Sequence, residues 1–174
     1  MYLFPIFYLV YDIIKIMKIK KLGHCCLVIE IDNKKIMTDP GAYSTFQSEE
    51  KNIDIIIITH EHPDHFHLES LKKVILNNPN VVIVTNNAVG KLLDEVKIEH
   101  KILEDKHFGE FGGVYFEAHG NQHAFIRSGV EPVQNTGYFI GQDLFYPGDA
   151  FTNPKKSVKI LALPVSAPWL KIED

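Results

Sequence analysis

The sequence predicts an α/β fold, a four-layer α/β/β/α sandwich in which two mixed β-sheets pack face to face with helices outside. Three observations lead to this prediction. The chain opens with short strands and tight turns, continues through a β-α-β-α passage, and then returns to strands. Hairpins pair strands antiparallel, whereas β-α-β units pair them parallel. Both kinds of connection in one chain therefore favour two mixed sheets over a singly wound parallel sheet.

The elements follow from local patterns along the chain. Runs rich in β-branched and aromatic residues between turn residues predict strands. These strands cover residues 18–22, 25–31, 35–38, 53–58, 81–84, 101–103, 113–118, 136–140, 144–146 and 158–163. Apolar residues at helical spacing predict helices over residues 68–76 and 88–95. Residues 53–58 are almost continuously β-branched, which is typical of a strand covered on both faces. Residues 119–135 lack strong periodicity and are expected to form a loop that contacts substrate.

Composition limits the classes of function. A chain of 174 residues with 45% hydrophobic residues can bury one core. The net charge of -4 and the pI near 6.1 give no basic surface for a phosphate backbone, so a small-molecule substrate is expected and nucleic acid is not. Cys25 and Cys26 are adjacent, and a disulfide between them would be strained. They are interpreted as buried reduced thiols, which fits a cytoplasmic protein.

The first residues are apolar but do not have the features of a targeting signal. Residues 1–11 lack a basic start and a small-residue cleavage site, and a run of about ten apolar residues is too short for a transmembrane helix. A second methionine, Met17, opens the patterned sequence. We therefore expect the domain to cover residues 17–174 and residues 1–16 to be a peripheral extension. An interfacial membrane anchor is the alternative for this extension.

Metal-ligand residues stand directly after the buried strand. Residues 60–65 read His-Glu-His-Pro-Asp-His, with three imidazoles and two carboxylates. In extended backbone His60 and His62 point the same way, and the turn that follows can bring Asp64 and His65 to a second point. Neutral imidazole and carboxylate are ligands that zinc takes in open catalytic sites. The spacing favours two neighbouring metal positions over a histidine-rich polar turn.

These residues resemble the signature of the metallo-β-lactamase superfamily. The similarity covers residues 53–65, and residues 38–41, Thr-Asp-Pro-Gly, resemble the family's Asp-Pro-Gly turn. His123 resembles the third histidine of the family's first metal. Asp149, in Tyr-Pro-Gly-Asp, resembles the carboxylate that bridges the two metals. The resemblance runs from about Lys18 to the C-terminus.

The resemblance implies a metal-dependent hydrolase with two zinc ions per chain. The opening Gly23-His24 and residues 164–169 are similar to a branch of small uncharacterised zinc-dependent hydrolases related to sugar-lactone hydrolases. The implied reaction is attack of a metal-bound hydroxide on a small ester, lactone or phosphoester. Iron and manganese accept the same ligands. An iron-dependent redox enzyme is disfavoured, because His62, rather than a carboxylate such as Glu61, stands where the diiron branch has a ligand.

Site residues are carried over by position. The resemblance assigns the first metal to His60, His62 and His123 and the second metal to Asp64 and His65, with Asp149 shared and with Asp64 and Asp149 as catalytic residues. Ligand histidines usually donate their other N–H to an oxygen, so Asp39 and Asp54 are candidate partners. His24 is a further candidate near the site, and Arg127 offers a fork for a substrate carboxylate or phosphate. Trp169 is expected to anchor the C-terminal segment rather than wall the pocket.

One departure from the family pattern affects the second metal. The family supplies a last histidine well after the bridging aspartate, whereas no histidine follows Asp149. We therefore expect a chain truncated at its C-terminus, with the last helix and strand missing. The alternative function is a non-catalytic metal-binding remnant of the same fold. An uncovered edge would favour self-association into a homo-oligomer.

Overall fold

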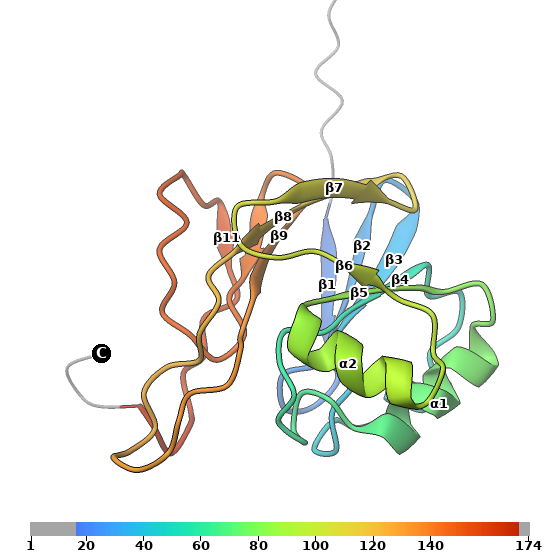
Figure 1. Cartoon of the computed structure of the whole chain (residues 1–174). Coiled ribbons are helices and arrows are strands. Elements are labelled where there is room, and N and C mark those ends of the chain that lie inside the picture. Colours follow the sequence, from blue (N-terminus) through green and yellow to red (C-terminus); the bar gives the residue numbers. More distant parts are fainter. Residues whose placement is uncertain (1–16, 171–174) are drawn as a thin grey trace, which may run out of the picture.

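Residues 17–170 are described by the computed structural model, and they form two β-sheets packed against each other (Figure 1). One sheet has six strands in the order β1-β2-β3-β4-β5-β6. These are β1 (Lys18–Lys21), β2 (Leu27–Ile31), β3 (Lys34–Thr38), β4 (Ile55–Ile57), β5 (Val82–Thr85) and β6 (Lys101–Ile102). β1, β2 and β3 pair antiparallel, and β3 to β6 pair parallel. The N-terminal extension expected at residues 1–16 lies outside the described residues.

The other sheet has five strands in the order β11-β10-β9-β8-β7. These are β7 (Phe108–Phe111), β8 (Val114–His119), β9 (Gly137–Ile140), β10 (Leu144–Tyr146) and β11 (Ile160–Leu161). β7 to β10 pair antiparallel, and β11 pairs parallel with β10. Both sheets are mixed, so the predicted pair of mixed sheets is confirmed.

The helices lie on the outer face of the six-stranded sheet (Figure 1). α1 (Leu68–Asn77) and α2 (Asn87–Glu95) fall almost where the sequence predicts them, and a short 3-10 helix, η1 (Gln47–Glu49), contacts α1. α2 begins after Asn86, whose side chain accepts a hydrogen bond from Val89 N as an N-cap. Within residues 17–170 no helix covers the outer face of the five-stranded sheet, and no helix is long and apolar enough to cross a membrane.

Two apolar layers hold the sandwich together. Alternate residues of β2 face opposite ways, with Leu27, Ile29 and Ile31 between the sheets and Val28 against the helices. The strand around β4 behaves the same way: Ile55 and Ile57 join the layer between the sheets, and Ile56 and Ile58 join the helix layer. This two-sided burial explains the continuous β-branched run in the sequence.

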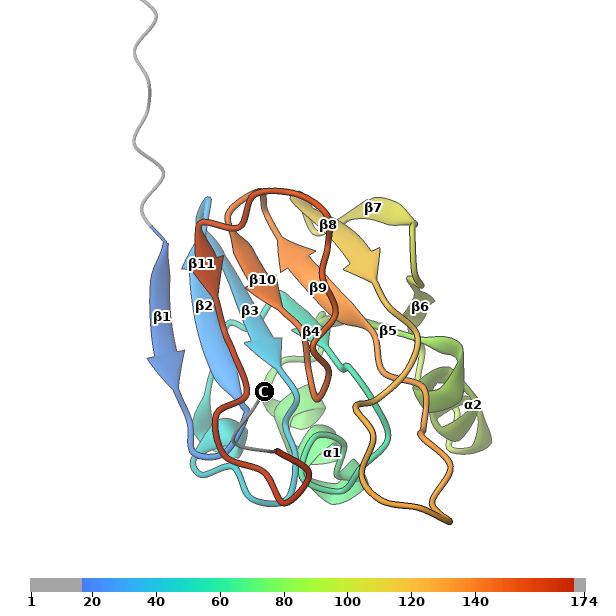
Figure 2. The ribbon, with the colours of Figure 1, turned by 90° about the vertical axis from the view of Figure 1, so that its left-hand side faces the viewer.

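The functional residues gather at one edge of the sandwich. β3, β4 and β5 are parallel and therefore end at the same edge, where Asp39, residues 58–67 and Asn86 follow them. The loops after β8 and β10 reach this edge from the other sheet, and the segment after β11 descends to it (Figure 2). Residues 120–136 contain no helix or strand, in agreement with the predicted loop.

Candidate metal centre

Three histidines meet where the two sheets come together. His60 and His62 follow β4, and His123 follows β8. The ring centroids of His60 and His62 are 4.8 Å apart, and that of His123 lies 5.1 Å from His60 and 4.8 Å from His62. One ligand atom of each lies within 4.8 Å of the others. We call these residues the three-histidine group, and it brings together the residues expected at the first metal.

Asp149 lies between this group and His65. Its Oδ1 is 3.2 Å from His65 Nε2, and its Oδ2 is 3.5 Å from His123 Nε2. His60, His65 and Asp149 also have ligand atoms within 4.8 Å of one another. Asp64 is close by, with its Oδ2 3.8 Å from His65 Nε2. A carboxylate with one oxygen toward each histidine has the placement that a shared ligand needs.

Hydrogen bonds fix the orientation of three of the rings. His65 Nδ1 lies 2.7 Å from Asp39 Oδ2, and His123 Nδ1 lies 2.7 Å from the Ala124 carbonyl oxygen. These oxygens can only accept, so each Nδ1 carries the proton. Thr59 donates its hydroxyl to Asp39 and can accept from His60 Nδ1 at 3.0 Å. All three rings therefore present Nε2 to the centre of the cluster.

Asp39 organises this arrangement from a fully buried position. Its Oδ1 accepts from Thr59 N at 2.7 Å. Its Oδ2 accepts from Thr59 Oγ1 at 2.7 Å, from His65 Nδ1 at 2.7 Å and from the Tyr146 hydroxyl at 2.8 Å. Tyr146 belongs to β10, so Asp39 connects the six-stranded sheet to the five-stranded one. Asp39 thus contacts a predicted ligand histidine, as the sequence suggests.

The cluster leaves buried nitrogen atoms without partners. The Nε2 atoms of His60, His65 and His123 are inaccessible and have no hydrogen bond of acceptable geometry among the described residues. An unpaired buried polar atom costs about 1–3 kcal/mol, so three in one place require a reason. Imidazole nitrogens converging beside a carboxylate match the donors of zinc sites, and the residues present fit a divalent cation.

The surroundings of these groups shift their pKa values in different directions. Burial, reinforced by the neighbouring His65, lowers the pKa of His60, and burial together with His123 lowers the pKa of His62. Burial also disfavours charge on His65, but the neighbouring carboxylates of Asp149 and Asp39 raise its pKa well above the ordinary value. For Asp149 burial is outweighed by the neighbouring rings of His123 and His65, which lower its pKa and keep it ionised.

Two glycines allow the backbone to close around the site. A Cβ on Gly41, in the Asp-Pro-Gly turn, would lie 1.8 Å from the Asp64 carbonyl oxygen. A Cβ on Gly148, next to Asp149, would lie 2.4 Å from Asn135 Oδ1, which itself accepts from Asp149 N at 3.0 Å. Side-chain-free residues are therefore needed where these turns press on the ligand-bearing segments.

A cavity of about 470 Å³ opens beside the cluster. His65 and Asp149 line one side of it, together with His24 and Cys25 from the turn between β1 and β2. The opposite side is apolar and comes from β11 and the residues after it, including Leu161, Leu163 and Val165. This cavity gives a small molecule access to the predicted ligands.

The remaining predicted residues divide into two sets. His24 lies at the cluster, with its Nε2 3.0 Å from Asp64 Oδ2. Asp54 does not: it precedes β4, at the end of the strand opposite His60, and its carboxylate accepts from Lys35 N and Lys34 Nζ. Arg127 is exposed in the long loop and does not line the cavity.

Several contacts at the site were not predicted. Trp169 does more than anchor the C-terminal segment, since its Nε1 donates to Asp149 Oδ2 at 3.1 Å and its ring packs against His123. Cys25, interpreted from the sequence only as a buried thiol, faces His65. Successive side chains of extended backbone point to opposite faces. Because Cys26 packs in the helix layer, the adjacent Cys25 is expected to face the other way.

Known proteins with similar sequences and folds point to one family. Residues 18–174 match the sequence profile of the beta-lactamase superfamily domain. Protein Rv0786c of Mycobacterium tuberculosis (strain ATCC 25618 / H37Rv) is 29% identical over 163 residues, covering 91% of this chain and 76% of that protein.

Two solved structures share the fold at low sequence identity. A candidate metal-dependent hydrolase from Parabacteroides distasonis ATCC 8503 superposes with a TM-score of 0.72 at 23% identity, covering 89% of this chain and 72% of that one. CmlA, a diiron beta-hydroxylase from Streptomyces venezuelae, superposes with a TM-score of 0.59 at 16% identity, covering 75% of this chain and 29% of that one.

The match to the superfamily profile covers almost every described residue, and the sheet architecture agrees with the fold that the sequence predicts. The predicted resemblance is thereby confirmed at the level of the superfamily. The chain belongs to the β-lactamase superfamily.

Proposed function

We propose that this protein is a dinuclear zinc hydrolase that cleaves a small ester, lactone or phosphoester. His60, His62 and His123 would hold the first metal, and Asp64 and His65 would hold the second, with Asp149 as a shared ligand. Within the superfamily, we propose that it belongs to the branch related to sugar-lactone hydrolases. We also place the protein in the cytoplasm, because both cysteines are free thiols.

One observation carries this proposal. Three buried Nε2 atoms, from His60, His65 and His123, converge on Asp149 without hydrogen-bond partners among the described residues. A metal ion satisfies such atoms, whereas a purely structural polar cluster would pair them with one another or with backbone groups. A shell of oxygen acceptors behind the rings is also typical of metal sites, where it sets the tautomer of each ligand histidine.

The chain's own groups would orient the reaction. Bound divalent cations lower the pKa of a water molecule and polarise the oxygen under attack. Asp64, whose Oδ2 lies 3.0 Å from His24 Nε2 and 3.8 Å from His65 Nε2, would take the proton that the attacking water loses. Asp149, which is held ionised, balances positive charge at the centre of the cluster. Trp169 and the Asn135 side chain hold Asp149 in position.

The cavity favours a neutral substrate with an apolar part. Leu161, Leu163 and Val165 form its apolar side. Lys21, the lysine among its lining residues, donates its Nζ to the His24 carbonyl oxygen at 2.7 Å and is thus already engaged. A strongly anionic phosphate would find little compensating charge on that side. We therefore rank esters and lactones ahead of phosphoesters.

The test is metal content together with hydrolysis. Purified protein would be analysed by inductively coupled plasma mass spectrometry and assayed with p-nitrophenyl butyrate, γ-butyrolactone and bis(p-nitrophenyl) phosphate. We expect zinc to be bound, and the variant His62→Ala to lose both bound metal and activity. The matched control is His107→Ala, which removes an exposed histidine outside the cluster and should change neither.

The outcomes separate the two functions that the sequence leaves open. Activity that survives His62→Ala would contradict a metal-dependent reaction at this site. Bound zinc with no hydrolysis of any of the three substrate classes would instead favour the non-catalytic metal-binding remnant. Iron or manganese in place of zinc would revise the cofactor and leave the ligand set standing.

A further inference from the structure

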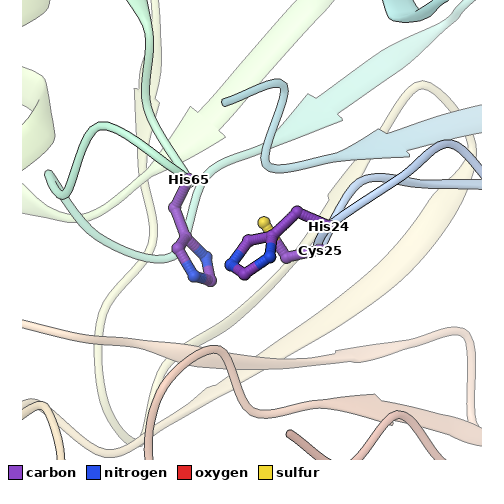
Figure 3. A group of neighbouring side chains, drawn as sticks. All are labelled: His24, Cys25 and His65. Atoms are coloured by element: carbon purple, nitrogen blue, oxygen red, sulfur yellow. The ribbon is translucent and has the colours of Figure 1, made fainter. Parts of the chain in front are cut away.

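The turn between β1 and β2 adds ligand-type side chains to the cluster. One ring nitrogen of His24, one ring nitrogen of His65 and the Cys25 Sγ all lie within 4.8 Å of one another. Figure 3 shows His24 and Cys25 on this turn directed toward His65 from the neighbouring segment. His24 Nε2 is also 3.0 Å from Asp64 Oδ2. With Asp64 and His65 these two residues form what we call the turn-side group.

The turn is held in this position by its backbone. Gly23 has φ 97 and forms a β-bridge with Ser44, and a Cβ there would lie 3.0 Å from Thr45 N. The Lys21 ammonium donates to the carbonyl oxygens of Gly23 and His24. The Tyr146 hydroxyl lies 2.8 Å from the Cys25 carbonyl oxygen and 2.8 Å from Asp39 Oδ2. The turn is therefore tied to the residue that orients His65.

The two adjacent cysteines occupy different environments. Cys26 is fully buried in the helix layer with Val28 and Met37. Cys25 is only partly buried, lines the cavity, and has its Sγ 3.1 Å from the Asp64 carbonyl oxygen. A thiol that serves only to fill the core would not need to open onto the cavity at a cluster of histidines. Cys25 is thus the cysteine positioned for chemistry.

We propose that His24 and Cys25 are ligands of the second metal ion, together with Asp64 and His65. This inference rests on the proposed metal-dependent function and extends it. Ligand atoms of a tetrahedral zinc ion lie about 3.3–3.8 Å apart, given zinc–ligand distances of about 2.0–2.3 Å. The 3.0 Å from His24 Nε2 to Asp64 Oδ2 and the 3.8 Å from His65 Nε2 to the same oxygen are close to this range.

The ligand set would give the second position a metal preference. Two imidazoles, a carboxylate and a thiolate match zinc and cobalt, whereas magnesium, calcium and manganese prefer oxygen ligands. The thiolate would add a soft ligand that the three-histidine group lacks.

The experiment uses cobalt as a spectroscopic probe of the thiolate. The full chain would be stripped of metal with a chelator and titrated with Co²⁺, and cobalt bound per chain would be measured after gel filtration. A cysteine thiolate bound to Co²⁺ gives a charge-transfer absorption in the near ultraviolet, which histidine and carboxylate ligands do not. We expect this band in the wild-type protein.

Two variants assign the band to one cysteine. Cys25→Ala should lose the band and bind about one cobalt ion fewer per chain. Cys26→Ala, the matched control, should keep both. Circular dichroism would verify that each variant is folded, and the wild-type spectrum tests the inference even if a variant fails to fold.

The inference and the proposed function fail in different ways. Cobalt bound without a near-ultraviolet band, or a band that persists in Cys25→Ala, would overturn the assignment of Cys25 and leave the metal-dependent function standing. A wild-type chain that binds no metal at all would overturn both.

Discussion

The three-histidine group and the turn-side group share one cluster but depend on different parts of the fold. His60, His62 and His123 come from both sheets, so a metal bound there connects the sheets. His24, Cys25, Asp64 and His65 all belong to the six-stranded sheet and its turns, and His24, Cys25 and His65 line the cavity. A metal at the three-histidine group would therefore serve mainly stability, and a metal at the turn-side group mainly chemistry at the cavity.

Removing a histidine from the three-histidine group should have the largest effect. His60→Ala deletes a fully buried ring whose Nε2 lacks a partner, and we expect complete loss of hydrolysis. A metal present at about a hundredfold its dissociation constant stabilises the fold by about 3 kcal/mol. Thermal unfolding with and without EDTA measures this: the wild type should lose clearly more stability with EDTA than His60→Ala does. An equal response in both would remove the first metal from this group.

The next effect concerns Asp39, which supports both groups. The Asp39 carboxylate accepts from four donor groups, and Asp39→Asn removes its charge and replaces one acceptor oxygen with an NH₂ group. We expect a loss of about 2–3 kcal/mol in the free energy of unfolding. Urea denaturation measures it. Asp54→Asn is the matched control, because that carboxylate pairs with a partly exposed lysine and should cost less than about 1 kcal/mol. Equal costs for the two variants would argue against the central place of Asp39.

A smaller change should act on the turn-side group more than on the three-histidine group. Gly41→Ala would press its methyl group against the Asp64 carbonyl and shift Asp64 and His65. Overpacking of this kind costs about 1–3 kcal/mol. Metal analysis should show the second metal weakened and the first retained. If both metals are lost together, the two positions do not act separately.

The smallest expected effect comes from removing the hydrogen bond that Trp169 donates to Asp149. Trp169→Phe keeps an aromatic ring beside His123 but removes the N–H donated to Asp149, and we expect a cost of about 1 kcal/mol. Steady-state kinetics should show a modest fall in kcat with metal content unchanged. A loss of metal in this variant would mean that Trp169 is required to hold Asp149 as a shared ligand.

The sequence predicts elements well where the local pattern is strong. The helix expected at residues 68–76 is observed as Leu68–Asn77, and the buried strand around β4 is where the β-branched run places it. β7 was missed because Phe-Gly-Glu-Phe has no β-branched residue, and it becomes a strand by pairing with β8. η1 was missed as well, since a single turn carries almost no periodicity.

At the candidate site, contacts between residues far apart in the sequence were the hardest to predict. Asp39 and Asp54 were both candidates as carboxylates near the motif, but sequence proximity does not say which end of a strand a side chain occupies. Asp39 follows β3 at the ligand edge, whereas Asp54 precedes β4 and accepts from Lys34 and Lys35. Cys25 and His65 are 40 positions apart in the sequence. Their approach depends on how β1, β2 and β3 pair. Local patterns carry no such information.

Trp169 has a consequence for observing this protein. It is the one tryptophan in the sequence, and its indole packs on His123 and hydrogen-bonds to Asp149. The intrinsic fluorescence of the chain therefore originates almost entirely beside the candidate metal centre. Arrival of a quenching ion such as Co²⁺, or of a substrate in the adjacent cavity, should be visible as a change in emission of the unlabelled protein in real time.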